Sequence, residues 1–263
     1  MDELFAVVGG GWHPLLVYPG GLTGLLLTFV LGTVWALPGA ATNQFPAALP
    51  ATAGALPAIA CGLLLLALLP VPRSYWAYPI DLIVALALLE LPYWLRLVSH
   101  LHASDVRTRV AATSQIGALL NVYVLLALAV AALGQASGSL LLPELKSGNQ
   151  SLRWAGLAAW AIALPPLLAF GPWQVLRGRD WSADVRRVGH IGLLIALALP
   201  AGDQVGYGAT AIAAAIAFVS LTSVHYLWRD SPERWERLQP LIALVLLVFM
   251  LRYGYEAWVA RLR

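Results

Sequence analysis

Eight long stretches of apolar residues, each almost free of charge, dominate this sequence. They lie at about 15–37, 51–70, 78–98, 111–134, 154–171, 187–201, 206–228 and 239–260. A bilayer core about 30 Å thick needs roughly 20 apolar residues in helical form. The stretches are continuous rather than alternating, and backbone groups in lipid must pair within their own segment, so helices are expected and strands are not. The sequence therefore predicts an all-α polytopic membrane helix bundle of about eight transmembrane helices, with residues 1–263 as one integral membrane domain.

The distribution of basic residues predicts the orientation of these helices. One side of the membrane would carry ten of them: Arg96, Arg107, Arg109, Arg177, Arg179, Arg186, Arg187, Arg229, Arg234 and Arg237. The other side would carry five: Arg73, Lys146, Arg153, Arg261 and Arg263. Because cytoplasmic loops are enriched in Lys and Arg, the first set is predicted to be cytoplasmic. Eight spans then place both termini outside, in a multi-pass protein of the inner (cytoplasmic) membrane.

Several chemistries have no residues to support them. The net charge of +3 does not indicate a nucleic-acid partner, and the single Cys61 excludes disulfide, iron–sulfur and Cys-ligated zinc sites within this chain. None of the motifs H-E-x-x-H, G-x-S-x-G or Walker A is present. A haem held by His190 and His225 is geometrically conceivable, but nothing specific supports it. We therefore predict no catalytic residue, no metal and no cofactor bound by this chain.

Glu90 is the main candidate for function, because it falls near the middle of a predicted span. An ionisable group at that depth is costly and is a functional hypothesis by default. One interpretation is a carboxylate that relays protons. The other is a structural Glu that is protonated, hydrogen-bonded or paired with a partner subunit. Asp81 is a second proton-transfer candidate, although its position favours a helix start near the interface.

Other polar residues in the predicted spans favour structural roles. Gln115, Asn121 and Tyr123 are expected to make hydrogen bonds between helices. Arg252 and Glu256 are spaced i, i+4 and can pair on one face of the last helix, or pair with a neighbouring subunit.

The stretch 171–187 is the most charged and aromatic connection, and we expect it to be a cytoplasmic loop. Trp and Arg are enriched at the centres of protein interfaces, so this loop predicts a docking surface. Its candidate residues are Trp173, Arg177, Arg179, Trp181, Arg186 and Arg187. The alternative is an ordinary positive-inside loop at the lipid headgroups.

Four segments resemble, in order, segments of one family. They are HPLLVYPGGLTGLLLTFVLG, IDLIVALALLELPYWLRL, RTRVAATSQIGALLNVYVLLALAVAALGQASGSL and RDSPERWERLQPLIALVLLVFML. The sequence is similar to the H subunit of bacterial complex I (subunit 1 in mitochondria) and to its relatives in energy-converting membrane hydrogenases and formate hydrogenlyases. That resemblance implies eight helices with both ends outside. It also implies cytoplasmic redox subunits and other membrane subunits as partners, and quinone at a subunit interface.

Three functions follow as hypotheses. The first is a membrane-anchoring subunit of a multisubunit respiratory or hydrogenase-type oxidoreductase, with redox chemistry in its partners and proton transfer through Glu90. The second is a stand-alone proton-coupled secondary transporter, against which the lack of an internal repeat counts. The third is a purely structural assembly subunit.

Overall fold

The computed structural model describes residues 26, 55–68, 79–168, 181–199 and 232–262. Its long helices are α3 (Ala55–Leu68), α4 (Leu82–Leu101), α5 (Val106–Ser137), α6 (Gln150–Leu167), α7 (Trp181–Ala198) and α9 (Pro232–Leu262). A short 3₁₀ turn, η2 (Glu144–Lys146), lies between α5 and α6. Within these ranges the only β-type pairing is an isolated bridge between Asp81 and Leu141. The all-helical class is therefore confirmed for this part of the chain.

Each of the six helices lies over one of the predicted apolar stretches. The predicted spans 15–37 and 206–228 lie outside the described residues, apart from residue 26. Two helices begin well before their predicted stretches: α9 begins at Pro232 and not near 239, and α7 begins at Trp181 and not near 187. Part of the expected loop 171–187 is therefore helix, and this places Arg186 and Arg187 on a packed helix.

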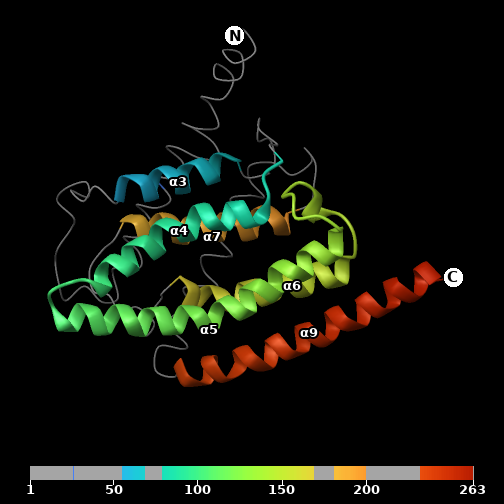
Figure 1. The fold of residues 1–263 in the computed structure, drawn as a ribbon. Helices are drawn as coiled ribbons and strands as arrows, with labels where there is room; N and C mark the ends of the chain where they lie inside the picture. Colours follow the sequence, from blue (N-terminus) through green and yellow to red (C-terminus); the bar gives the residue numbers. More distant parts are fainter. Residues whose placement is uncertain (1–25, 27–54, 69–78, 169–180, 200–231, 263) are drawn as a thin grey trace, which may run out of the picture.

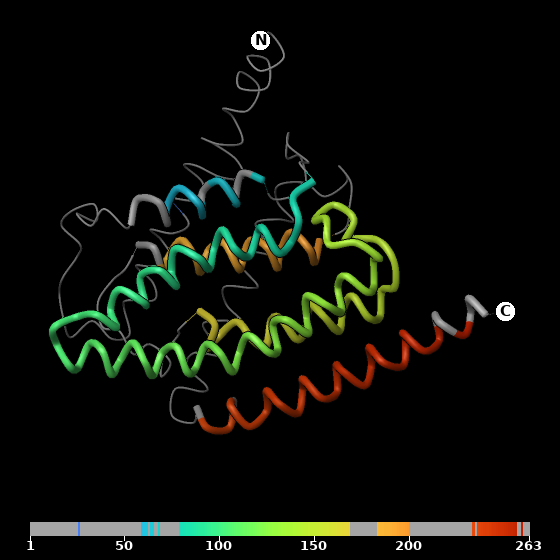
Figure 2. Tube along the Cα trace, in the orientation of Figure 1, coloured from blue at the N-terminus to red at the C-terminus, as the bar shows by residue number. Residues whose placement is uncertain are grey.

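The helices run side by side as a bundle; successive helices from α4 to α7 alternate in direction, whereas α7 and α9 run the same way (Figures 1 and 2). The α4–α5 connection lies at one end of the bundle. The long connection from α5 to α6 lies at the other end, together with the C-terminus. This alternation matches a chain that crosses a membrane repeatedly.

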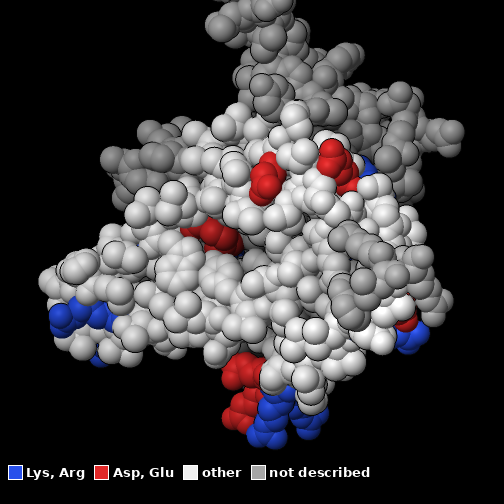
Figure 3. Space-filling model, turned by 45° about the vertical axis from the view of Figure 1, so that its right-hand side comes forward, with Lys and Arg blue, Asp and Glu red and all other residues white. Residues whose placement is uncertain are grey.

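In the part of the chain that the structure describes, three helical segments are long and apolar enough to cross a bilayer: Leu82–Leu101, Val106–Ser137 and Glu236–Glu256. The α3 helix has 14 residues and is shorter than a full span. The α7 helix carries Asp184, Arg186 and Arg187 within its 18 residues, which lowers its apolar character. Figure 3 shows the charged side chains in a few separate groups, with broad uncharged surface between them.

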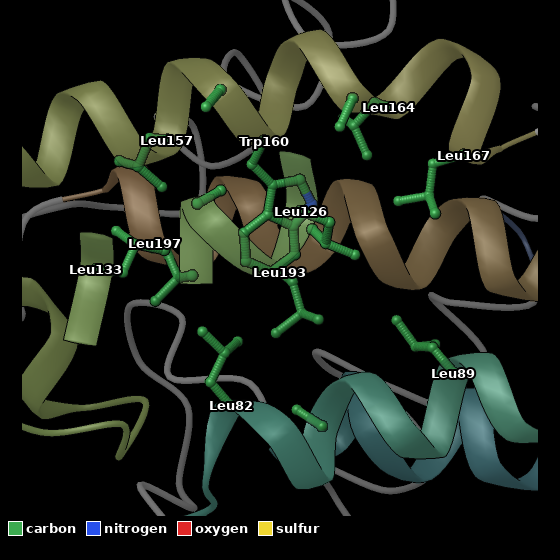
Figure 4. Packing of buried hydrophobic residues seen from close by; sticks show 14 of the residues in the cluster. Leu82, Leu89, Leu126, Leu133, Leu157, Trp160, Leu164, Leu167, Leu193 and Leu197 are labelled. Atoms are coloured by element: carbon green, nitrogen blue, oxygen red, sulfur yellow. The ribbon is translucent and has the colours of Figure 1, made fainter. Parts of the chain in front are cut away.

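Trp160 of α6 occupies the centre of the core and is fully buried. Figure 4 shows it between Leu126 of α5 and Leu193 of α7, with leucines from α4 nearby. Lipid is as apolar as these side chains, so close packing rather than water exclusion holds such helices together. A well-filled centre therefore contributes directly to the stability of the bundle.

Small residues allow the helices to approach one another closely. A Cβ atom at Gly156 of α6 would lie 3.1 Å from the carbonyl oxygen of Ala129 on α5. One at Gly189 of α7 would lie 2.3 Å from a methyl group of Leu89 on α4. These glycines act as ordinary packing positions between helices.

The connection between α5 and α6 is fastened to the bundle. The backbone N–H of Leu82 donates to Leu140 at 2.8 Å, and that of Leu142 donates to Ile80 at 2.9 Å. The side chains of Leu142 and Leu145 are fully buried. The 3₁₀ turn η2 lies within this connection.

Two glycines in this connection provide a matched test of backbone strain. Gly138 and Gly148 both have positive φ, at 76° and 88°. A Cβ atom at Gly148 would also lie 1.9 Å from the carbonyl oxygen of Ala136, whereas nothing lies within 4 Å at Gly138. We expect Gly138→Ala to cost about 1–2 kcal/mol of unfolding free energy. Gly148→Ala should cost about 3 kcal/mol or more. Thermal unfolding in detergent measures both, and equal losses would contradict this structure of the connection.

Candidate functional site

A cluster of polar side chains lies inside the bundle, centred on Glu90. On α4, Glu90, Tyr93 and Trp94 are spaced i, i+3 and i+4 and therefore share one helix face. On α7, Arg186 and His190 are spaced i, i+4 and share the facing side. Helical periodicity on two neighbouring helices thus brings an acid, a guanidinium and an imidazole together.

Glu90 and Arg186 form a bidentate ion pair. The Nε of Arg186 donates to Oε1 of Glu90 at 2.9 Å, and Nη2 donates to Oε2 at 2.8 Å. The Glu90 side chain is 11% exposed and the Arg186 side chain is 2% exposed. Two parallel charge-assisted hydrogen bonds fix the geometry of the pair and compensate the two charges in a poorly solvated place.

Two further groups complete the coordination of the carboxylate. His190 Nε2 bonds to Oε1, and the Tyr123 hydroxyl on α5 donates to Oε2. Trp94 Nε1 then donates to the Tyr123 oxygen at 2.8 Å. Two carboxylate oxygens offer about four lone-pair sites, so all of them are occupied.

Arg186 is held from two more directions. Its Nη1 donates to the carbonyl oxygen of Leu167, at the end of α6. Its guanidinium carbon lies 4.2 Å from the centre of the Tyr93 ring, which is close enough for a cation–π contact. The cluster therefore joins α4, α5, α6 and α7.

His190 is the fully buried titratable group of this cluster. Its ring meets Trp160 edge-on, with 6.3 Å between ring centres. When Nε2–H donates to Glu90, the neutral ring leaves Nδ1 as an acceptor. That Nδ1 has no hydrogen-bond partner among the described residues. A proton that reaches Nδ1 can thus be exchanged for the one that faces Glu90.

Arginines also cap the C-terminal ends of α6 and α7, which lie at opposite ends of the bundle. Arg187 Nε donates to the carbonyl oxygen of Leu168 at 3.0 Å, and its Nη1 pairs with Asp184 at 2.8 Å. At the opposite end of the bundle, Arg153 Nη2 donates to Leu197 at 2.6 Å. Cations at helix C-termini satisfy open carbonyls and oppose the helix dipole. Each of the two helices thus supplies the cap of the other.

The connection that precedes α6 contains a lysine, Lys146, whose pKa is lowered by its surroundings. Burial, and then the nearby charge of Arg153, lower the pKa of Lys146 to about 8. Its folded pKa lies below its usual value, so folding favours the neutral amine. This group therefore opposes folding below about pH 8, and the penalty is relieved as the pH rises from about 8 toward the usual pKa of a lysine.

The structure separates the predicted site residues into distinct places. Asp81 is the N-cap of α4, and its side chain accepts from the Ile83 N–H at 2.7 Å, away from the Glu90 cluster. Arg186 points into the bundle, so it does not contribute to an exposed docking surface. Arg187 is tied to α6 and Asp184 as described, and Trp181 is the first residue of α7. The other docking candidates, Trp173, Arg177 and Arg179, lie outside the described residues.

Several smaller sequence predictions can be checked directly. Gln115 is buried, as expected of a packing residue, and Tyr123 makes an interhelical hydrogen bond. Arg252 and Glu256 pair at 3.0 Å on the surface of α9. Asn121 is exposed and lies on the side of α5 that faces α9. Sequence reasoning did not connect Arg186 and His190 with Glu90, although their i, i+4 spacing is a visible signal.

Within the described ranges, no group of three or more His, Cys, Asp or Glu side chains is placed to hold a metal ion. His225, the other half of the haem pair considered above, lies outside those ranges. No protein-family model matches the chain, and no curated protein is found to be similar to it.

The ion pair gives a stability prediction. Glu90→Gln leaves the Arg186 guanidinium buried without its counter-charge, so the variant should lose about 3–5 kcal/mol of unfolding free energy. Glu90→Leu combined with Arg186→Met removes both charges, and it should recover most of that loss. Thermal unfolding in detergent compares the variants. If Glu90→Gln is as stable as the unmodified chain, the cluster is not an ion pair.

Proposed function

We propose that this chain is a membrane-anchoring subunit of a multisubunit respiratory or hydrogenase-type oxidoreductase, and that it passes protons through His190 and Glu90. The eight-helix layout predicted from the sequence resembles that of the complex I H subunit. In this proposal the redox groups belong to cytoplasmic partners, and quinone is met at an interface with them. The protein resides in the inner membrane with both termini outside.

One observation carries the proton-transfer part of the proposal. A fully buried imidazole joins a buried carboxylate through one ring nitrogen, while the other nitrogen has no partner in the described part of the chain. Imidazole is the side chain whose unperturbed pKa lies closest to physiological pH, so it is suited to accept and release protons. Ionisable residues inside membrane bundles are typical of proton relays.

A specific feature favours the structural alternative. Every lone-pair site of Glu90 is occupied, so Glu90 must lose a hydrogen bond before it can accept a proton. An ion pair that only fixes the packing of four helices would look the same. The two functions differ in whether the imidazole titrates during turnover.

Orientation can be tested with single cysteines. Ser104 lies in the α4–α5 connection and Ser147 in the α5–α6 connection, and both are exposed at opposite ends of the bundle. After Cys61 is replaced by Ala, we expect Ser147→Cys to react with an impermeant thiol reagent in right-side-out vesicles. Ser104→Cys should react only after the membrane is opened. The reverse pattern would contradict the predicted orientation.

The relay can be tested at His190. His190→Gln keeps an N–H donor toward Glu90 and removes the titrating ring, so the bundle should assemble normally. Proton uptake should fall about 100-fold or more, as when a positioned acid–base group is lost. The measurement uses the full chain with its co-purifying partners, in vesicles with an imposed potential and an internal pH dye.

Trp94→Phe is the matched control, because it disturbs the edge of the same cluster and removes no titrating group. It should leave proton uptake nearly unchanged. Unchanged uptake in His190→Gln would favour the structural subunit. Proton-coupled solute transport by a chain that purifies alone would instead favour the stand-alone transporter.

A further inference from the structure

A cleft on the far side of α5 from the Glu90 cluster lies between α5, α6 and α9. Its volume is about 360 Å³, and most of its lining is apolar. Three polar side chains interrupt that lining: Asn121, Glu236 and Gln239. Asn121 and Glu236 are exposed, so the cleft opens onto the surface of the bundle.

Gln239 is the cleft residue whose side chain indicates a bound ligand. It is 6% exposed, and its amide nitrogen has no hydrogen-bond partner among the described residues. A buried amide without a partner costs about 1–3 kcal/mol. Because Gln239 lines the cleft, an acceptor atom placed there would satisfy this amide.

A second hollow of about 480 Å³ continues along the same face of α9. Its lining includes Gln135 of α5 and Leu247, Met250 and Gly254 of α9. The α9 residues of the two hollows recur every three or four positions, so they follow one face of that helix. About 22 Å of helix separates Gln239 from Gly254, which exceeds the roughly 15 Å that one lipid leaflet contributes to a bilayer core.

The seam between α5 and α9 is therefore polar at one end and apolar along its length. Its polar end lies near the start of α9, where Glu233, Arg234 and Arg237 are exposed. The exposed leucines and valines of α9 lie further along the helix. This order, from charged to hydrogen-bonding to apolar, matches a phospholipid from its phosphate through its ester linkages to its acyl chain.

We propose that the cleft between α5, α6 and α9 binds a diacyl phospholipid, with the Gln239 amide donating to an ester carbonyl and one acyl chain lying along the α5–α9 seam. The headgroup would lie at the start of α9, where the exposed Arg237 directly follows the cleft-lining Glu236. Pro166 of α6 lines the same cleft and directly precedes Leu167, whose carbonyl accepts from Arg186. The lipid would thus contact the helix end that holds the ion pair.

An ester lipid and its ether analogue provide the test, because the ether analogue lacks the carbonyl. Native mass spectrometry of the full chain in detergent, titrated with diacyl or dialkyl-ether phosphatidylglycerol, measures the two affinities. Loss of one hydrogen bond should weaken binding of the ether lipid about fivefold in the unmodified chain. Gln239→Leu should remove this preference.

Gln115→Leu is the matched control, since it also removes a buried amide but does not line the cleft. It should keep the ester preference, which shows that a buried Gln→Leu change alone is not responsible. Equal affinity for ester and ether lipids in the unmodified chain would overturn the proposal. Displacement of the ester lipid by a short-chain quinone at comparable concentration would overturn the choice of occupant.

Discussion

The pairing of Glu90 with Arg186 sets the arrangement of the helices around it. A charge moved from water into a poorly solvated interior loses several kcal/mol of solvation, so each partner requires the other. Because the guanidinium also donates to the end of α6, and the carboxylate accepts from Tyr123 of α5, four helices meet at this pair. A rotation or a one-turn shift of α4 or α7 would separate the two charges. The apolar core, which tolerates substitutions of similar volume, is less specific.

Two further arginines, Arg153 and the half-buried Arg187, extend this principle to the helix ends. Arg187 and Arg153 sit at opposite ends of the α6–α7 pair, and each donates to a carbonyl of the neighbouring helix. Basic residues near membrane edges are usually interpreted as orientation signals. Here the same side chains also satisfy backbone groups that helices leave open at their C-termini. Residues that the sequence suggests as orientation signals therefore also contribute to the packing of the helix ends.

The sequence predicted the positions of the helices better than it predicted which side chains contact each other across helices. Continuous apolar stretches predicted each of the six long helices described, because the requirement for internal backbone pairing in lipid leaves few alternatives. The pairing of Arg252 with Glu256 followed from spacing within one helix. The partner of Glu90 could not be obtained in the same way, since it lies on another helix 96 residues further along the chain. The start of α7 was misplaced for a related reason. Two adjacent arginines such as Arg186 and Arg187 are typical of a solvent-exposed loop, and only the structure shows that they have buried partners on other helices.

The same separation along the chain affects how the protein is made. Glu90 is synthesised 96 residues before Arg186. At about 5–20 residues per second, the interval is roughly 5–20 s. During that interval the Glu90 carboxyl of α4 has no counter-ion, so in lipid its protonated, neutral form has the lower free energy. The arrival of α7 then converts a neutral acid into half of an ion pair and releases a proton. Completion of the bundle is thus a chemical step as well as a packing step, and it fixes α4 in place only after most of the chain has left the ribosome.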